Sequence, residues 1–277
     1  MNLNKNCPVT TPLVKSSAII VALGLSAGMA LAAGTASDTA SNYAPGSWST
    51  TPANLGSGFG AWNIIASPNG GSAGTYLDSG SSIKTGGYSW GTYANNSSTA
   101  NISISRAFTA GNSTSSSLYN QTFSFDLSSD GVGPSQGLLS AEIGTAFLFA
   151  YNGAGSDNFT LSVDGGASTA LSAVNFTALH AGLTVSLAVS GALNSSSEAY
   201  TFTVSPFAGG SPLYTSSGTF DSSAYNTSSF NYLDSNTTGN GYFNNLNITP
   251  EIVPEPSTMA LAGLSGFLTL LALRRRK

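Results

Sequence analysis

The stretch Leu183-Thr-Val-Ser-Leu-Ala-Val189 decides the fold, because every second residue is apolar and the residues between are small or polar. Successive side chains of a strand point to opposite sides, so this period of two predicts a β-strand with one buried face. The alternation recurs in QTFSFDL (121–127), NFTLSVD (158–164), AYTFTVS (199–205) and YFNNLNI (242–248). Clusters of Gly, Asn, Asp and Ser separate the runs, as turns require. The sequence therefore predicts an all-β body.

This body, residues 33–250, has room for about ten short strands. Strands at such spacing without long helices favour an antiparallel β-sandwich, and we predict a jelly roll. The run Glu142–Tyr151 (EIGTAFLFAY) is apolar on both parities, which predicts a central strand covered on both sides or a strand with a bulge. In the run 242–248, Tyr242 shares its parity with Leu246. We expect one short helix near Val174–Ala181, which contains the only histidine, His180.

Charge is scarce in this chain and unevenly placed. Only 7% of the residues are charged, against about 25% in an average soluble domain, which excludes the highly charged disordered class. Between Gly34 and Val253, eleven acidic residues face two cations, Lys84 and Arg106. So acidic a body predicts no nucleic-acid partner. The single cysteine, Cys7, excludes an intramolecular disulfide and a cysteine-based zinc site.

Residues 1–32 have the pattern of a secretory signal peptide. A polar, basic beginning leads into the uncharged apolar run Ala18–Ala33, which we expect to be helical. The run contains Ala30-Leu31-Ala32, and signal peptidase needs such small side chains at the positions −3 and −1 of its cleavage site. We predict cleavage after Ala32, with an uncleaved N-terminal membrane anchor as the alternative.

Residues 251–277 contain three successive parts. The tripeptide Pro254-Glu255-Pro256 comes first, the apolar run Met259–Leu273 follows, and the chain ends in Arg274, Arg275, Arg276 and Lys277. As a helix the 15-residue run would be about 22 Å long, against about 30 Å of hydrocarbon, so it can cross a bilayer if its flanking residues snorkel. The terminal cations would stay in the cytoplasm. We therefore predict a C-terminal transmembrane helix with a basic stop.

This order of motif, span and basic end resembles the PEP-CTERM sorting signal of Gram-negative bacteria. The resemblance implies export and processing near the tripeptide by an exosortase, a membrane enzyme similar to transpeptidases. It implies passage from a transient inner-membrane anchorage to the cell envelope or the extracellular space. A plain C-terminal membrane anchor is the alternative. The run Tyr242–Leu246 also looks like the closing strand of lectin-like sandwiches on exported proteins of this kind.

Arg106 stands at an unexpected position in the run NISISRAF (101–108). It has the parity of Ile102, Ile104 and Phe108, which we expect to face the core. An unpaired buried charge is costly, so we predict that a register change after Ile104, or a strand end, takes Arg106 to water. The alternative is a buried cation paired with an acid.

Three aromatic residues, Tyr88, Trp90 and Tyr93, are candidates for a platform that binds sugar rings, although core packing is the reading we favour. Asp126 and Asp130 are candidates for oxygen ligands of Ca²⁺. The D-x-D-x-D spacing of a calcium loop is absent, and Asp is a common turn residue. We therefore predict neither a metal nor a cofactor.

Catalytic patterns are weak. Residues 70–74 (GGSAG) match G-x-S-x-G, but that motif needs a strand before the serine and a helix after it, whereas a turn precedes it here and no helix follows. His180 is the only possible histidine base. Glu142 and Glu198 are the only glutamates of the sandwich, and a glycosidase would need a carboxylate pair about 5–10 Å apart. We predict no catalytic residue.

Three functions remain open at this point. The first is an exported, non-enzymatic protein of the cell envelope or of an extracellular matrix of exopolysaccharide or biofilm. The second is a lectin-like module that binds carbohydrate. The third is a hydrolase that acts on polysaccharide, for which Glu142 or Glu198 would have to face a cleft.

Overall fold

The computed structural model describes residues 35–49, 52–108, 121–130, 137–152, 157–190, 196–221, 229–235 and 239–250. The predicted signal peptide, with Ala30 and Ala32, lies outside these ranges. So does the sorting tail, with Pro254, Glu255, Pro256, Arg274, Arg275, Arg276 and Lys277. None of the helices within the described ranges combines the length and the apolar character needed to span a bilayer.

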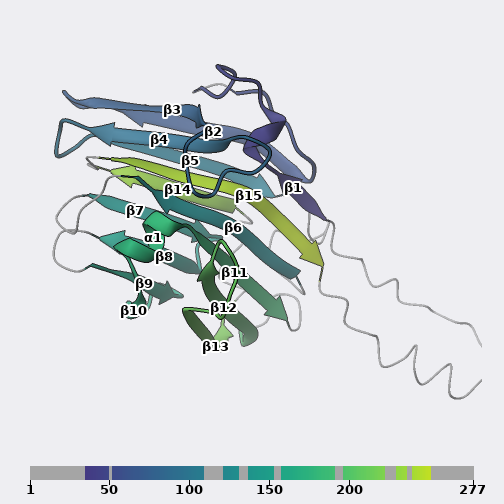
Figure 1. Cartoon of the computed structure of the whole chain (residues 1–277). Coiled ribbons are helices and arrows are strands. Elements are labelled where there is room, and N and C mark those ends of the chain that lie inside the picture. Colours follow the sequence, from purple (N-terminus) through teal and green to yellow (C-terminus); the bar gives the residue numbers. More distant parts are fainter. Residues whose placement is uncertain are drawn as a thin grey trace, which may run out of the picture. The chain divides into compact units, whose positions relative to one another are not determined.

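The described residues form two antiparallel sheets packed as a sandwich (Figure 1), which confirms the predicted all-β sandwich. The eight-stranded sheet has the order β13 (Tyr214–Phe220), β12 (Glu198–Pro206), β11 (Leu183–Ser190), β6 (Gln121–Ser129), β15 (Asn240–Pro250), β4 (Ser89–Asn95) and β3 (Ser72–Asp78), and β1 (Ala36–Asp38) pairs with β15. The seven-stranded sheet has the order β10 (Thr169–Asn175), β9 (Asn158–Val163), β8 (Phe147–Asn152), β7 (Leu138–Ile143), β14 (Ser229–Ser235), β5 (Asn101–Phe108) and β2 (Phe59–Ser67). A 3₁₀ turn, η1 (Ala40–Asn42), and a helix, α1 (Phe176–Ala181), complete these elements.

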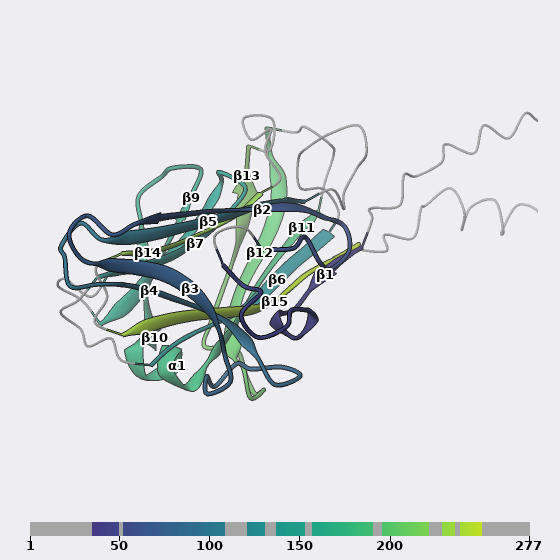
Figure 2. The same cartoon turned by 90° about the horizontal axis from the view of Figure 1, so that it is seen from above.

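The core lies between the two layers that Figure 2 shows from above. Along β11, Leu183, Val185, Leu187 and Val189 are buried and alternate with half-buried residues, as the period of two predicts. Aromatic rings from both sheets meet these aliphatic side chains: the ring centroids of Phe125 of β6 and Phe230 of β14 are 5.1 Å apart. Because each aromatic side chain removes about 150–250 Å² from water, such contacts dominate the stability of the sandwich.

We predicted a single strand for the run Glu142–Tyr151, but this run forms a hairpin. β7 ends at Ile143 and β8 begins at Phe147, and these two residues pair. Gly144 takes a positive φ of 61° in the turn between them, a conformation that glycine adopts without steric cost. The apolar residues fall on both parities because the tight turn restarts the alternation.

The predicted short helix is confirmed as α1. Asn175 caps it, since its side-chain oxygen accepts a hydrogen bond from the backbone N–H of Ala178 at 3.0 Å. Gly182 ends it with a φ of 98°. Leu179 is buried in the core, so one face of this short helix fastens it to the sandwich.

Arg106 contradicts the prediction that its side chain reaches water. It is 1% exposed, and the pairing of β5 with β14 runs without a shift from Ile104 to Arg106. Its Nη1 forms a buried ion pair with Oδ2 of Asp38 on β1. The alternative of a buried cation with an acidic partner therefore holds. That partner stands far away in the sequence, so the local pattern gave no sign of it.

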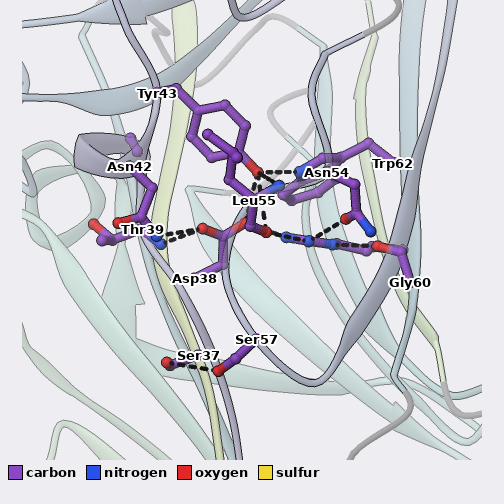
Figure 3. Close-up of polar contacts among 12 residues, drawn as sticks. Ser37, Asp38, Thr39, Asn42, Tyr43, Asn54, Leu55, Ser57, Gly60 and Trp62 are labelled. Carbon is purple, nitrogen blue, oxygen red and sulfur yellow. Dashed lines mark hydrogen bonds and ion pairs between the residues drawn. The ribbon is translucent and has the colours of Figure 1, made fainter.

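The other polar atoms of this ion pair are also hydrogen-bonded (Figure 3). Arg106 donates to the carbonyl oxygens of Gly60 (2.8 Å) and Leu55 (2.6 Å) and to the side chain of Asn54 (2.6 Å). The Asp38 carboxylate accepts from the Thr39 N–H (2.9 Å), the Asn42 amide (2.7 Å) and the Tyr43 hydroxyl (2.7 Å). The guanidinium carbon lies 4.4 Å from the ring centroid of Trp62, a cation–π contact. Such a full set of partners lets two charges remain buried.

Candidate functional site

Two strands at one edge of the eight-stranded sheet carry the same tripeptide. Gly74-Thr75-Tyr76 lies on β3 and Gly91-Thr92-Tyr93 on β4. The antiparallel register pairs the two segments with each other, so that each tyrosine stands opposite the other segment's glycine. The side chain of Thr92 is buried, which places the two tyrosines on the outer face of the sheet.

The missing Cβ atoms of these glycines let the rings lie across the sheet. A Cβ on Gly91 would be 2.7 Å from Cζ of Tyr76, and a Cβ on Gly74 would be 2.4 Å from Oη of Tyr93. The two half-buried rings have centroids 6.3 Å apart. We call Tyr76 and Tyr93 the tyrosine pair: two half-buried aromatic rings lie beside each other on the sheet, with their planes tilted by 45°.

A pocket of about 330 Å³ lies on the same outer face, next to the tyrosine pair. It is lined by Asp78, Gly80, Ser81, Ser82, Ser128, Ser129, Asp130, His180 and Tyr242, and we call it the acidic pocket. The loop after β3 and helix α1 meet at its rim, where Ser82 Oγ donates to the carbonyl of His180 at 3.0 Å. His180 in turn lies 2.9 Å from the carbonyl of Ser129, measured from its Nδ1.

A chain of hydroxyl groups connects the tyrosine pair to the acidic pocket. Tyr76 donates to the hydroxyl of Tyr242 at 3.3 Å, and Tyr242 donates to Oδ2 of Asp130. Asn240 gives this carboxylate two more hydrogen bonds, from its backbone N–H at 2.8 Å and its amide at 3.0 Å. Asp130 therefore stands at the end of an ordered series of donors.

These contacts set the protonation of the site. Burial by itself raises the pKa of Asp130, but the hydrogen bonds from Tyr242 and Asn240 outweigh it and hold the pKa below its usual value. Burial raises the pKa of Tyr76 to about 12, and the nearby carboxylates Asp78 and Asp130 add to this shift. At neutral pH the pocket therefore combines an ionised carboxylate with neutral phenol groups.

Ser128 adds a polar group at the inner side of the pocket. Ser128 on β6 pairs with Tyr242 on β15, and it is 1% exposed. Its hydroxyl has no hydrogen-bond partner among the described residues. A buried hydroxyl without a partner costs about 1–3 kcal/mol, so a bound group that reaches it would recover that free energy.

The structure separates the three predicted platform residues. Tyr93 is on the outer face, but Trp90 is 0% exposed in the core, with its ring centroid 5.1 Å from that of Phe243. Tyr88 is half-buried beside the core, and its carbonyl accepts a hydrogen bond from Asn244. Trp90 therefore packs in the core, the interpretation that we favoured, because residues 90 and 93 point to opposite sides of β4.

The sequence missed Tyr76, Asp78, Ser128 and Tyr242 as site residues. The repeated Gly-Thr-Tyr was the signal that could have found Tyr76, because a tripeptide repeated at that distance fits two paired strands. The others are brought into the site by pairing with distant strands or by the loop after β3.

The two calcium candidates have different surroundings. Asp126 is buried and accepts hydrogen bonds from Thr184 and Asn245, both at 2.6 Å, and burial raises its pKa. Asp130 is held by Asn240 and Tyr242. Nowhere in the described part of the chain do three His, Cys, Asp or Glu side chains gather in a way that could hold a metal ion.

The glutamates considered for hydrolysis lie on different sheets. Glu142 of β7 is half-buried and accepts a hydrogen bond from Asn231 at 3.2 Å, and burial raises its pKa. Glu198 is 0% exposed at the start of β12. Ser72, the serine of the G-x-S-x-G match, begins β3, whereas His180 contacts β6. The strands β15 and β4 lie between β6 and β3, so the sheet separates this serine from the histidine.

Comparison with known proteins finds one sequence motif at the end of the chain. A family model described as the PEP-CTERM protein-sorting motif matches residues 253–277. The motif implies export, anchoring of the tail in the membrane before processing, and processing by an exosortase. No curated protein matches the chain.

Several solved structures resemble the body in fold. The CBM2 module of the evolved Dit protein of Lactobacillus casei BL23 phage J-1 is 11% identical, with a TM-score of 0.42 over 79% of this chain and 99% of that one. A glycosyl hydrolase family protein from Mycobacterium fortuitum is 10% identical, with a TM-score of 0.41 over 68% and 90%. The family 11 carbohydrate-binding module of Clostridium thermocellum is 13% identical, with a TM-score of 0.31 over 68% and 88%. A likeness at this level says nothing of function.

Proposed function

We propose that this chain is an exported, non-enzymatic protein of the cell envelope or extracellular polymer, and that its sandwich binds polysaccharide in the manner of a lectin. The observation that carries the proposal is the tyrosine pair, Tyr76 and Tyr93, lying beside the acidic pocket on one face of a sheet. The sorting motif at residues 253–277 supports the exported location.

The chemistry of this face suits a sugar chain. Aromatic surfaces bind the apolar C–H face of a sugar ring, while carboxylates and hydroxyl groups bind its hydroxyls. The pocket volume of about 330 Å³ falls in the range of small-ligand sites. A polysaccharide that stacks on the tyrosine pair would place a neighbouring sugar unit in the acidic pocket.

A binding role also agrees with the positions of the acids. A glycosidase needs two carboxylates about 5–10 Å apart on either side of the scissile bond. Glu142 and Glu198 belong to opposite sheets, and neither lines the acidic pocket. Hydrolysis by these two glutamates is therefore not supported at this site, and we assign the two carboxylates that do line it, Asp78 and Asp130, to binding.

We also infer that eight strands form the predicted jelly roll. The order β4-β15-β6-β11 in one sheet faces β5-β14-β7-β8 in the other. In each sheet, strands from the middle and the end of the chain interleave as in two Greek keys. The hairpins β9–β10 and β12–β13 extend the two sheets beyond this set.

Oligosaccharide binding tests the proposed lectin-like role. The full-length protein and its variants Tyr76→Ala and Tyr93→Ala are measured against a glycan array and then by calorimetry with the best binder. Each variant should lose about tenfold in affinity, which corresponds to about 1.4 kcal/mol of stacking. Ile65→Ala removes an apolar side chain that is 54% exposed on β2 of the other sheet, and it should bind like the wild type. An array without any binder would contradict the proposal.

Intact-mass analysis of the protein from the cells that naturally produce it tests its export and processing. The mass should correspond to a chain that begins near residue 33 and ends near the motif Pro254–Pro256. A mass that still includes Arg274 to Lys277 would contradict the proposed removal of the tail.

A further inference from the structure

The acidic pocket is electrically one-sided. Asp78 and Asp130 line it, and the negative charge of both acts on the phenol of Tyr76. Lys84, the cation of the loop after β3, is not among the lining residues. It is exposed and donates a hydrogen bond to the carbonyl of Ser79 at 2.7 Å. Among the described lining residues, only His180 could carry a positive charge.

Both carboxylates keep capacity for a further donor. Asp78 Oδ2 accepts from the backbone N–H groups of Gly80 and Ser81, and no hydrogen bond within the described residues involves its Oδ1. Within the described residues, the side-chain Oδ1 of Asp130 accepts one hydrogen bond, from the backbone N–H of Asn240. Since a carboxylate oxygen has two lone pairs, each Oδ1 can take another hydrogen bond.

Ser128 is an independent observation that points to a ligand in this pocket. Ser128 is one of the lining residues, and its buried hydroxyl lacks a partner in the described part of the chain. Two carboxylate oxygens and one hydroxyl oxygen are thus available as acceptors around one pocket. This set matches an ammonium group, which has three N–H donors and no acceptor.

We propose that the acidic pocket selects a sugar unit with a free, protonated amine, such as glucosamine, within the polysaccharide that the tyrosine pair holds. This inference rests on the function proposed above and specifies the class of its ligand. An N-acetyl group has no positive charge and would desolvate the carboxylates without compensating them. A uronic acid would be repelled by the same charges.

Three β-1,4-linked oligosaccharides of equal length test the selectivity: oligomers of glucosamine, of N-acetylglucosamine and of glucose. Calorimetry with the full-length protein at pH 6 and low salt should give at least tenfold tighter binding of the glucosamine oligomer. Added salt should reduce this advantage, because ions screen charge attraction more than they affect stacking.

Two substitutions locate the source of the selectivity. Asp78→Asn and Asp130→Asn should each bring the affinity for the glucosamine oligomer close to that for the glucose oligomer, so that the tenfold advantage disappears. Asp164→Asn, which removes the same charge at an exposed turn, should keep the full advantage. If Asp130→Asn fails to fold because an amide keeps only one of the two oxygens that accept from Tyr242 and Asn240, Asp78→Asn still decides the question.

The outcomes separate the two proposals. Equal binding of all three oligomers, or an advantage that survives Asp78→Asn, would overturn the amine selectivity and leave the lectin-like role standing. Failure of all three to bind, while the protein is folded by circular dichroism, would also overturn the amine selectivity, and the glycan array then decides whether the lectin-like role stands.

Discussion

Arg106 and Asp38 form an ion pair in which both side chains are fully buried. Taking two charges out of water costs several kcal/mol, and their attraction offsets this only when the remaining donors and acceptors are satisfied. Gly60, Leu55 and Asn54 complete the partners of the arginine. The pair therefore joins β1, the segment before β2, and β5.

Replacing Arg106 with Met should destabilise the protein by about 3–5 kcal/mol, because the Asp38 carboxylate would stay buried without its cation. Urea unfolding followed by fluorescence measures this free energy. The double variant Asp38→Asn with Arg106→Met should recover part of the loss. Lys84→Met makes the same change at an exposed site, and its effect should stay within about 0.5 kcal/mol. An equally stable Arg106→Met variant would show that the pair contributes nothing.

Single residues mark the limit of what the sequence could predict. The parity of Arg106 placed it on the buried face, but the pattern could not supply Asp38, which stands on a three-residue strand. Trp90 and Tyr93 are close in sequence and looked like one group, yet a strand sends them to opposite sides. Local periodicity assigns a face to a residue, whereas its partners depend on which strands pair.

At the scale of elements, β15 is the strand on which the site depends. It pairs with β6, β4 and β1, and a register shift against β6 falls between Asn244 and Asn247. Asn245 has a positive φ of 51° at this bulge. The side chain of Asn244 is 0% exposed and bridges η1 to the loop after β3, since it accepts from Ala40 and donates to Ile83.

Gly241 of β15 lies where the two sheets approach closely. A Cβ there would be 2.1 Å from the Tyr232 hydroxyl and 2.8 Å from Leu139 Cδ1. Gly241→Ala should therefore lower the free energy of unfolding by about 1–3 kcal/mol, measured by thermal and urea denaturation. The double variant with Tyr232→Phe should recover part of this loss.

Gly60→Ala is the control for this substitution. The new Cβ at position 60 would be 3.4 Å from Cβ of Ala107, an ordinary contact. The free energy of unfolding of this variant should therefore be unchanged or slightly higher. Equal effects of the two substitutions would contradict the steric argument.

Elements were the part of the fold that the sequence predicted best. All five alternating runs are strands, namely β6, β9, β11, β12 and β15. The bulge in β15 was missed, and with it the parity of this strand: Leu246 faces the core with Phe243, while Tyr242 lies on the pocket side. The bulge in β15 and the tight hairpin between β7 and β8 both change which parity faces the core. The apolar pattern alone does not show where such a change occurs.

At the scale of the whole molecule, buried phenols should make the protein sensitive to alkali. Burial raises the pKa of Tyr43, Tyr76 and Tyr151 to about 12, against about 10 in an unfolded chain. The folded state then holds more protons, so this contribution to stability is fully present below pH 10 and is lost as the pH rises towards 12.

Urea unfolding at several pH values between about 9 and 12 should give a decreasing free energy of unfolding above pH 10. The phenolate absorbance of the folded protein should increase at a higher pH than that of the urea-unfolded chain. A free energy of unfolding that stays flat from pH 9 to 12 would contradict these raised pKa values.

The strand that leads into the sorting tail has a mechanical consequence. β15 ends at Pro250, directly before the tail sequence, and it lies between β6 on one side and β4 and β1 on the other. A force that pulls on the tail while the body is held therefore drags β15 lengthwise through the sheet. Its hydrogen bonds then share the load at once, instead of opening one after another as in an unzipped hairpin. The connection between body and tail is thus of the kind that resists traction.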